Sequence, residues 1–98
     1  MAQWDVHLVS GENYVLDIQN DFLSGVTTRL VVPLLPPDQT PKGYPKLTPA
    51  VVVGDVLLYA AVIQMTALPR HTLGPIVAHA ESARDDVTRA LDMVLAGV

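Results

Sequence analysis

The sequence contains no cysteine, which excludes a disulfide framework and any chemistry that depends on a thiolate. Charge is also scarce, because Asp, Glu, Lys and Arg make up 16% of the 98 residues whereas hydrophobic residues make up 50%. One domain of this size cannot enclose that much apolar surface in its own core. We therefore expect a single domain over residues 1–98 that covers part of its apolar surface by forming a homodimer.

Two further absences limit the kinds of partner. The six basic residues are scattered along a chain of net charge −4, so no basic patch suited to direct nucleic-acid binding is predicted. No apolar run approaches the length that crosses a membrane, and the N-terminal residues do not have the pattern of a secretory leader. We expect a cytoplasmic protein with no membrane partner.

No motif for a metal, a cofactor or a nucleophilic enzyme is present. The histidines His7, His71 and His79 have no metal-ligand spacing, and the isolated glycines exclude a phosphate-binding loop. We therefore predict no metal site and no cofactor. A metal-free ribonuclease needs only a base, an acid and a cation, and His7, Arg29, Arg70 and His71 are the groups available for it.

The first half of the chain has the pattern of short strands. Residues 4–9 alternate as in a half-buried strand, and residues 14–19 are typical of the returning strand of a hairpin. Residues 29–35 also favour a strand, although Pro33 indicates an edge position or a bulge. Five prolines from Pro36 to Pro49 then form a stiff connection, of a length that is more often functional or mobile than incidental.

A second hairpin is predicted over residues 50–64, with a tight turn at Gly54. The run from Val56 to Ile63 is almost entirely apolar, which predicts a strand covered by the core on one face and by a second subunit on the other. Beyond it, residues 66–74 are expected to be irregular with a short strand near Thr72. Residues 75–80 are expected to form a loop or a helical turn.

The last seventeen residues predict a helix. Ser82 and Asp85 have the spacing of a capping box, Asp85 and Arg89 can pair along one face, and Gly97 is a natural end. One apolar stripe consists of Val87, Ala90, Leu91, Val94, Leu95 and Val98. The predicted fold is α+β and mostly β: a small, strongly bent antiparallel sheet or partly open barrel, closed by this helix.

Phe22 and Leu23 are neighbouring large apolar residues in a polar stretch, residues 20–28, that is predicted to be a loop. Such residues are either tucked under the loop or held out for a partner. The sequence leaves both alternatives open.

Five stretches carry a more specific signal. They are Leu16-Asp-Ile-Gln-Asn-Asp21, Thr28-Arg-Leu-Val-Val-Pro-Leu34, Val53-Gly-Asp55, Met65-Thr-Ala-Leu-Pro69 and the helix from Ser82 to Val98. In this order and at nearly this spacing they resemble the segments VDVQSD, RLVIPL, IGD and MTSVP and the terminal helix of the CcdB toxin family. The family helix ends in Gly-Ile, and the corresponding residues here are Gly97 and Val98.

The resemblance implies a homodimer with the SH3-like barrel that CcdB proteins share with MazF-type ribonuclease toxins. It implies a toxin that is not an enzyme, binds the A subunit of DNA gyrase and traps the cleaved gyrase–DNA complex. It also implies a CcdA-like antitoxin whose disordered C-terminal segment neutralises the toxin. Promoter DNA would be contacted only through that antitoxin, which agrees with the acidic net charge of this chain.

The resemblance also suggests which residues act. Gyrase is expected to contact Asp92, Ala96, Gly97 and Val98, and the antitoxin is expected to contact Phe22, Leu23, Asp92, Met93 and Ala96. One position departs from the best-known pattern, because Ala96 stands where that pattern has a tryptophan, a large anchor of the kind that often dominates an interface. A ribonuclease toxin on the same fold and a homologue with a lost or altered target are the alternatives.

Overall fold

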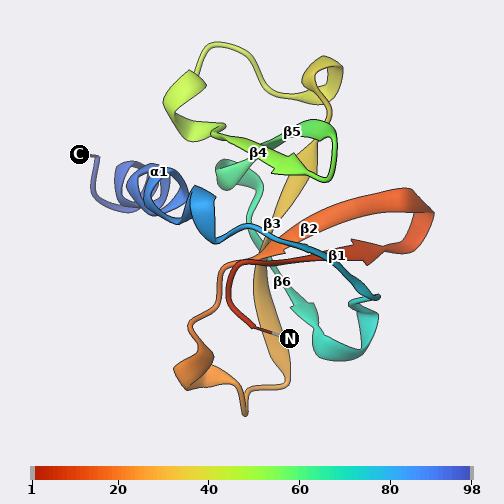
Figure 1. The fold of residues 1–98 in the computed structure, drawn as a ribbon. Coiled ribbons are helices and arrows are strands. Elements are labelled where there is room, and N and C mark those ends of the chain that lie inside the picture. Colours follow the sequence, from red (N-terminus) through yellow and green to blue (C-terminus); the bar gives the residue numbers. More distant parts are fainter. Residues whose placement is uncertain (1, 98) are drawn as a thin grey trace.

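The computed structural model describes residues 2–97, which form one antiparallel sheet and one long helix (Figure 1). The strands within this range are β1 Asp5–Val9, β2 Asn13–Asp17, β3 Thr28–Leu35, β4 Ala50–Val53, β5 Val56–Ala60, β6 Thr66–Pro69 and β7 Ile76–His79. The helix is α1, Arg84–Ala96. Single 3₁₀ turns cover Ser10–Glu12, Asp21–Leu23, Pro37–Gln39, Pro45–Leu47, Val62–Gln64, Arg70–Thr72 and Glu81–Ala83.

Neighbouring strands follow the order β4-β5-β3-β2-β1-β7, and β6 pairs with the first half of β3. Every pairing is antiparallel. Since β7 also lies against β4, the sheet bends until it is nearly a closed barrel. The predicted class, mostly β with a bent sheet and a C-terminal helix, is confirmed.

Pro33 lies in the central strand, not at an edge of the sheet. One side of β3 pairs with β2 along residues 14–17, whereas the other side changes partner from β6 to β5. Pro33 falls in the gap between these two partners, where its carbonyl accepts a hydrogen bond from the Ala61 N–H at 2.9 Å. A residue without an N–H is tolerated there because no ladder bond is required of it.

The bent sheet buries residues on both of its faces in β1, β2 and β3. One face packs against α1 through Val6, Leu16, Val32, Leu34, Val87 and Ala90. The other face is also enclosed, and it holds the polar residues Asp5, His7, Asp17 and Arg29. The prediction of a half-buried first strand is therefore wrong, because Asp5 and His7, which alternation assigned to the solvent face, are buried as well.

Two segments differ from the sequence-based expectation. The strand β6 occupies Thr66–Pro69 and a 3₁₀ turn occupies Arg70–Thr72, so a strand near Thr72 is wrong. Residues 76–79 form the strand β7, not a loop or a helical turn. Only four residues long and preceded by Pro75, β7 has too little periodicity to be recognised, and its pairing with β1 defines it.

The helix begins later than its capping pattern predicts. Ser82 belongs to a preceding 3₁₀ turn, so it is not the N-cap residue of the helix. The N-cap residue is Ala83, which makes no side-chain capping bond. Arg89 pairs with Asp86 at 3.1 Å and not with Asp85. The predicted end is confirmed: Gly97 has a φ of 72°, and its N–H donates to the Met93 carbonyl at 3.0 Å.

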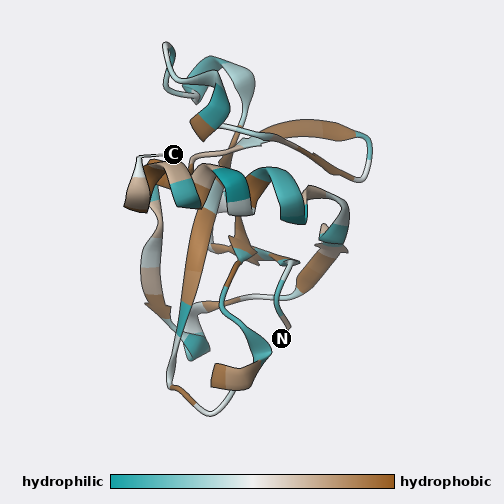
Figure 2. Cartoon of the chain, turned by 90° about the vertical axis from the view of Figure 1, so that its left-hand side faces the viewer, coloured by the Kyte–Doolittle hydropathy of each residue, from teal (hydrophilic) through white to brown (hydrophobic). Residues whose placement is uncertain are grey.

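The apolar stripe of α1 extends past the surface that it covers. Val87 and Ala90 are fully buried and Leu91 is partly buried, but Leu95 is 76% exposed. Val98 lies outside the described residues. Figure 2 shows α1 with a hydrophilic side toward the viewer and hydrophobic residues toward its C-terminal end. Among residues 2–97, no helix is both long enough and apolar enough to cross a membrane.

Candidate partner-binding site

An exposed turn at one end of the molecule carries the two apolar residues singled out in the sequence. The side chain of Phe22 is 93% exposed and that of Leu23 is 48% exposed. Val26, later in the same loop, is 42% exposed. Of the two alternatives, the structure therefore supports residues held out from the protein and not tucked beneath the loop.

Hydrogen bonds to Asn20 form this turn. The Asn20 side-chain oxygen accepts the N–H of Phe22 at 2.8 Å, and the Asn20 carbonyl accepts the N–H of Leu23 at 2.9 Å. Because these bonds are made by Asn20 and the backbone, the Phe22 side chain contributes nothing to them. Its apolar ring is left to solvent at the tip of the loop.

The last turns of α1 form a second exposed apolar surface. Asp92, Ala96 and Gly97 are exposed, and Met93 is half-buried. Leu95 adds a large apolar side chain to this region. The neighbouring position 98 lies outside the described residues.

These two surfaces do not share one hollow within a single chain. Met93 lines a depression of about 450 Å³ between α1 and the proline-rich connection, together with Pro45, Lys46, Pro49, Asp86 and Arg89. Neither Phe22 nor Leu23 lines it. The residues assigned to the antitoxin thus lie on two separate elements, the 20–27 loop and α1.

The groups weighed for a ribonuclease are not gathered at one exposed place. His7 is 2% exposed, and its Nδ1 donates to the Gly74 carbonyl at 3.0 Å. Arg29 is 1% exposed and forms an ion pair with Asp17 at 2.8 Å. Arg70 and His71 are exposed on another element. Within residues 2–97, no group of three or more His, Cys, Asp or Glu side chains lies close enough together to hold a metal ion.

Buried polar contacts are the feature that the sequence analysis missed. Asp5 is 5% exposed and accepts a 2.6 Å hydrogen bond from Nδ1 of His79, and Asp17 holds Arg29. Charged residues inside strand-like apolar runs were the available signal, since burying a charge requires a partner. The identity of each partner depends on strand register, which the sequence does not give.

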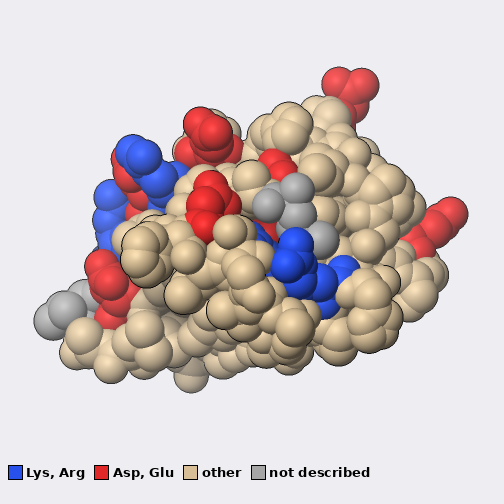
Figure 3. All heavy atoms as spheres, turned by 90° about the horizontal axis from the view of Figure 1, so that it is seen from below, with Lys and Arg blue, Asp and Glu red and all other residues tan. Residues whose placement is uncertain are grey.

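On the face seen in Figure 3, acidic and basic side chains are interspersed over a mostly uncharged surface.

The fold has known counterparts. An endoribonuclease in complex with its cognate antitoxin from a mycobacterial species matches with a TM-score of 0.79 and 16% identity, covering 97% of this chain and 94% of that one. A second mycobacterial endoribonuclease matches with a TM-score of 0.79 and 15% identity, covering 97% and 90%. Such identities show a shared fold and nothing more.

No curated protein matches the sequence significantly. A family model gives the stronger result, because it matches residues 3–97 and so includes both the exposed Phe22 turn and the end of α1. Its description is CcdB protein. The chain therefore belongs to the CcdB family.

Proposed function

We propose that this CcdB-family protein, a toxin of a toxin–antitoxin module, acts by binding the A subunit of DNA gyrase and trapping the cleaved gyrase–DNA complex. The observation that supports this proposal best is the exposed end of α1, where Leu95 is 76% exposed beyond the buried residues Val87 and Ala90. An apolar helix end left uncovered by its own chain is suited to a protein partner.

The gyrase contact is assigned to Asp92, Ala96, Gly97 and Val98. Ala96 and Asp92 are exposed on α1, so both are accessible to another protein. Gly97 has no side chain to hold a partner backbone at a distance. Val98 would add a small apolar anchor next to it.

The antitoxin contact is assigned to Phe22 and Leu23 together with Asp92, Met93 and Ala96. A disordered segment can follow surfaces that are separated on the toxin, because it orders as it binds. The separation of the 20–27 loop from α1 is therefore compatible with one extended partner segment. Promoter DNA would be bound by the antitoxin and not by this acidic chain.

The chain has more apolar surface than one small domain can bury, and this excess supports a homodimer. Val52 is 64% exposed and its register partner Leu57 is 44% exposed on one face of the β4–β5 hairpin. A second copy of the chain is the proposed cover for this face. The run from Val56 to Ile63 is not one strand as predicted, because β5 ends at Ala60 and a 3₁₀ turn follows at Val62–Gln64. Within one chain, Val56, Leu57 and Ile63 are exposed.

A ribonuclease toxin is the second candidate, and the shared fold with mycobacterial endoribonucleases favours it. The burial of both His7 and Arg29 disfavours it, because a catalytic group must reach its substrate. We therefore place the non-enzymatic gyrase poison first.

Induced expression in bacteria separates these proposals. Double-strand breaks and an SOS response are the expected result for a gyrase poison, whereas rapid messenger decay with intact DNA would overturn it in favour of the ribonuclease. Normal growth would instead support a homologue that has lost its target. Co-expression with the cognate antitoxin is the control, and it should restore growth.

A further inference from the structure

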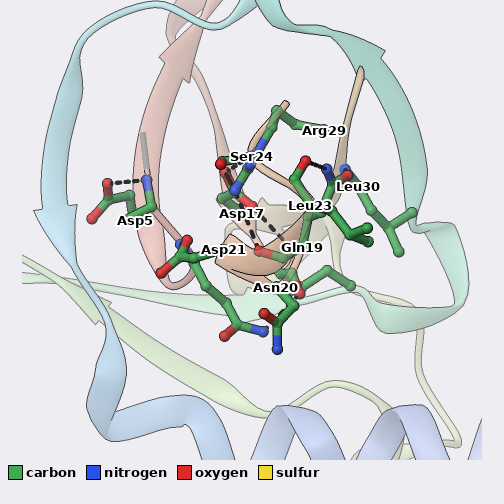
Figure 4. A network of polar contacts seen from close by, with 12 residues as sticks. Asp5, Asp17, Gln19, Asn20, Asp21, Leu23, Ser24, Arg29 and Leu30 are labelled. Carbon is green, nitrogen blue, oxygen red and sulfur yellow. Dashed lines mark hydrogen bonds and ion pairs between the residues drawn. The ribbon is translucent and has the colours of Figure 1, made fainter. Parts of the chain in front are cut away.

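Gln19 connects the exposed 20–27 loop to the sheet. Its side chain is 8% exposed and reaches in two directions (Figure 4). The amide Nε2 donates to the Leu23 carbonyl at 3.1 Å, and the amide Oε1 accepts the Leu30 N–H at 2.9 Å. One buried side chain thus joins the Phe22 turn, Asp21–Leu23, to the strand β3.

The backbone of Gln19 is also held by hydrogen bonds, to the side chains of Asp17 and Arg29. Its N–H donates to Oδ1 of Asp17 at 3.0 Å, and its carbonyl accepts from Nη2 of Arg29 at 3.3 Å. Asp17 and Arg29 form a fully buried ion pair, which cannot relax by exchanging partners with water. Gln19 is therefore anchored to a fully buried ion pair of the sheet, and all four of its polar groups are used.

Other polar contacts hold the remainder of the loop. The guanidinium of Arg70 donates to the Ser24 carbonyl at 2.9 Å, and its backbone N–H donates to the Thr27 carbonyl at 2.9 Å. Oδ1 of Asp21 accepts the N–H of Gln3 at 2.8 Å. The large apolar side chains of the loop are exposed, so hydrogen bonds and not apolar packing fix its shape.

We propose that Gln19 is a positioning residue that presets the Phe22 turn for the antitoxin. This inference rests on the proposed role of Phe22 and Leu23 in antitoxin binding. A surface that is already ordered avoids the cost of ordering its side chains and backbone during association. Releasing the turn should therefore weaken binding by about tenfold.

The test is Gln19→Met, which keeps the length of the side chain and removes both polar atoms. Both lost bonds are only partly buried, so water should be able to reach the Leu23 carbonyl and the Leu30 N–H, and the protein should stay folded. Hydrogen exchange should accelerate at the amides of residues 21–24 and remain unchanged in the rest of β2 and β3. Calorimetric titration with the cognate antitoxin should show about a tenfold loss of affinity.

Two matched variants complete the experiment. Gln39→Met makes the same change at an exposed glutamine and should alter neither measurement. Arg70→Met releases Ser24 from the opposite side of the loop and should reproduce part of the effect. Faster exchange throughout β2 and β3 in Gln19→Met would make Gln19 a general structural residue and overturn the inference.

Phe22→Ser distinguishes failure of the inference from failure of the proposed function. If Phe22→Ser leaves antitoxin affinity unchanged, the turn is not the contact and the assignment of Phe22 is overturned. If Phe22→Ser weakens binding while Gln19→Met changes neither exchange nor affinity, only the positioning role of Gln19 is overturned.

Discussion

Both Nε and Nη2 of Arg29 lie 2.8 Å from the same carboxylate oxygen of Asp17, and neither side chain is more than 1% exposed. The other oxygen of Asp17 accepts the N–H of Gln19. The guanidinium group of Arg29 is therefore bonded to groups in the protein interior. An arginine committed in this way supports the sheet and is not available to a substrate.

The first prediction follows from that burial. Arg29→Met should leave the Asp17 carboxylate buried without its cation and destabilise the protein by about 3–5 kcal/mol, measured by urea denaturation. Arg84→Met is the control, since its ion pair with Asp85 is largely exposed and should contribute at most about 1 kcal/mol. An Arg29→Met protein of normal stability that had lost a ribonuclease activity would contradict this structural role.

The sequence predicts most of the fold and only part of the site, for identifiable reasons. The two hairpins and α1 follow from apolar periodicity and from turn glycines such as Gly54 and Gly97, which are local signals. The strand β7 and the enclosure of His7 depend on pairing between distant segments. Likewise, Phe22 could be recognised as an unusual loop residue, but the bonds from Gln19 that hold its turn arise only from tertiary structure.

Gly74 provides a test of the β1–β7 junction. Its N–H donates to the Leu8 carbonyl at 2.9 Å, and a β-carbon at this position would collide with that same carbonyl oxygen. Gly74→Ala should therefore force the two backbones apart and cost roughly 1–3 kcal/mol in thermal or urea unfolding. Gly25→Ala is the matched control, because nothing lies within 4 Å of its added carbon. Equal stability of the two variants would show that the junction yields without cost.

The homodimer prediction can be tested on the outer face of the β4–β5 hairpin. Val52 and Leu57 are opposite each other in register, and both are exposed in the single chain. Sedimentation at micromolar concentration should give twice the 10.5 kDa chain mass for the wild type. Val52→Lys should give the monomer mass, because a lysine charge would be buried at the interface.

Val26→Lys makes the same substitution in the 20–27 loop and should leave the dimer intact. A monomeric wild type would refute the dimer itself. A dimeric Val52→Lys protein would show instead that a different face is used.

The antitoxin assignment predicts separate effects on binding and on stability. Phe22→Ser should reduce antitoxin affinity by about 30-fold if the ring is an interface anchor, which corresponds to about 2 kcal/mol. Its free energy of unfolding should change by no more than about 0.5 kcal/mol, because the side chain is 93% exposed. Leu23→Ser should act in the same direction. Ile76→Ser, at an exposed position on β7, is the control and should leave antitoxin affinity unchanged. If Phe22→Ser unfolded the protein, the Phe22 ring would belong to the core.

The final prediction concerns the end of α1. Deleting residues 96–98 removes the bond from the Gly97 N–H to Met93 but no buried side chain among the described residues, so it should cost only roughly 1 kcal/mol of stability. Toxicity on induced expression should nevertheless be abolished, because the proposed gyrase contact is lost. Antitoxin binding should change little, since Ala96, with its small side chain, is the only assigned antitoxin contact that is lost.

Ala96→Trp is the complementary variant. The side chain at position 96 is exposed, so an indole there would meet a partner and not the core of its own chain. A large rigid aromatic is the residue type most often found to dominate an interface, and it should tighten binding to the gyrase A subunit in a pull-down or calorimetric titration. The two variants should thus move toxicity in opposite directions at nearly constant melting temperature. If the protein without residues 96–98 still killed cells at the wild-type level, these residues would only end the helix, and the proposed gyrase contact would be refuted.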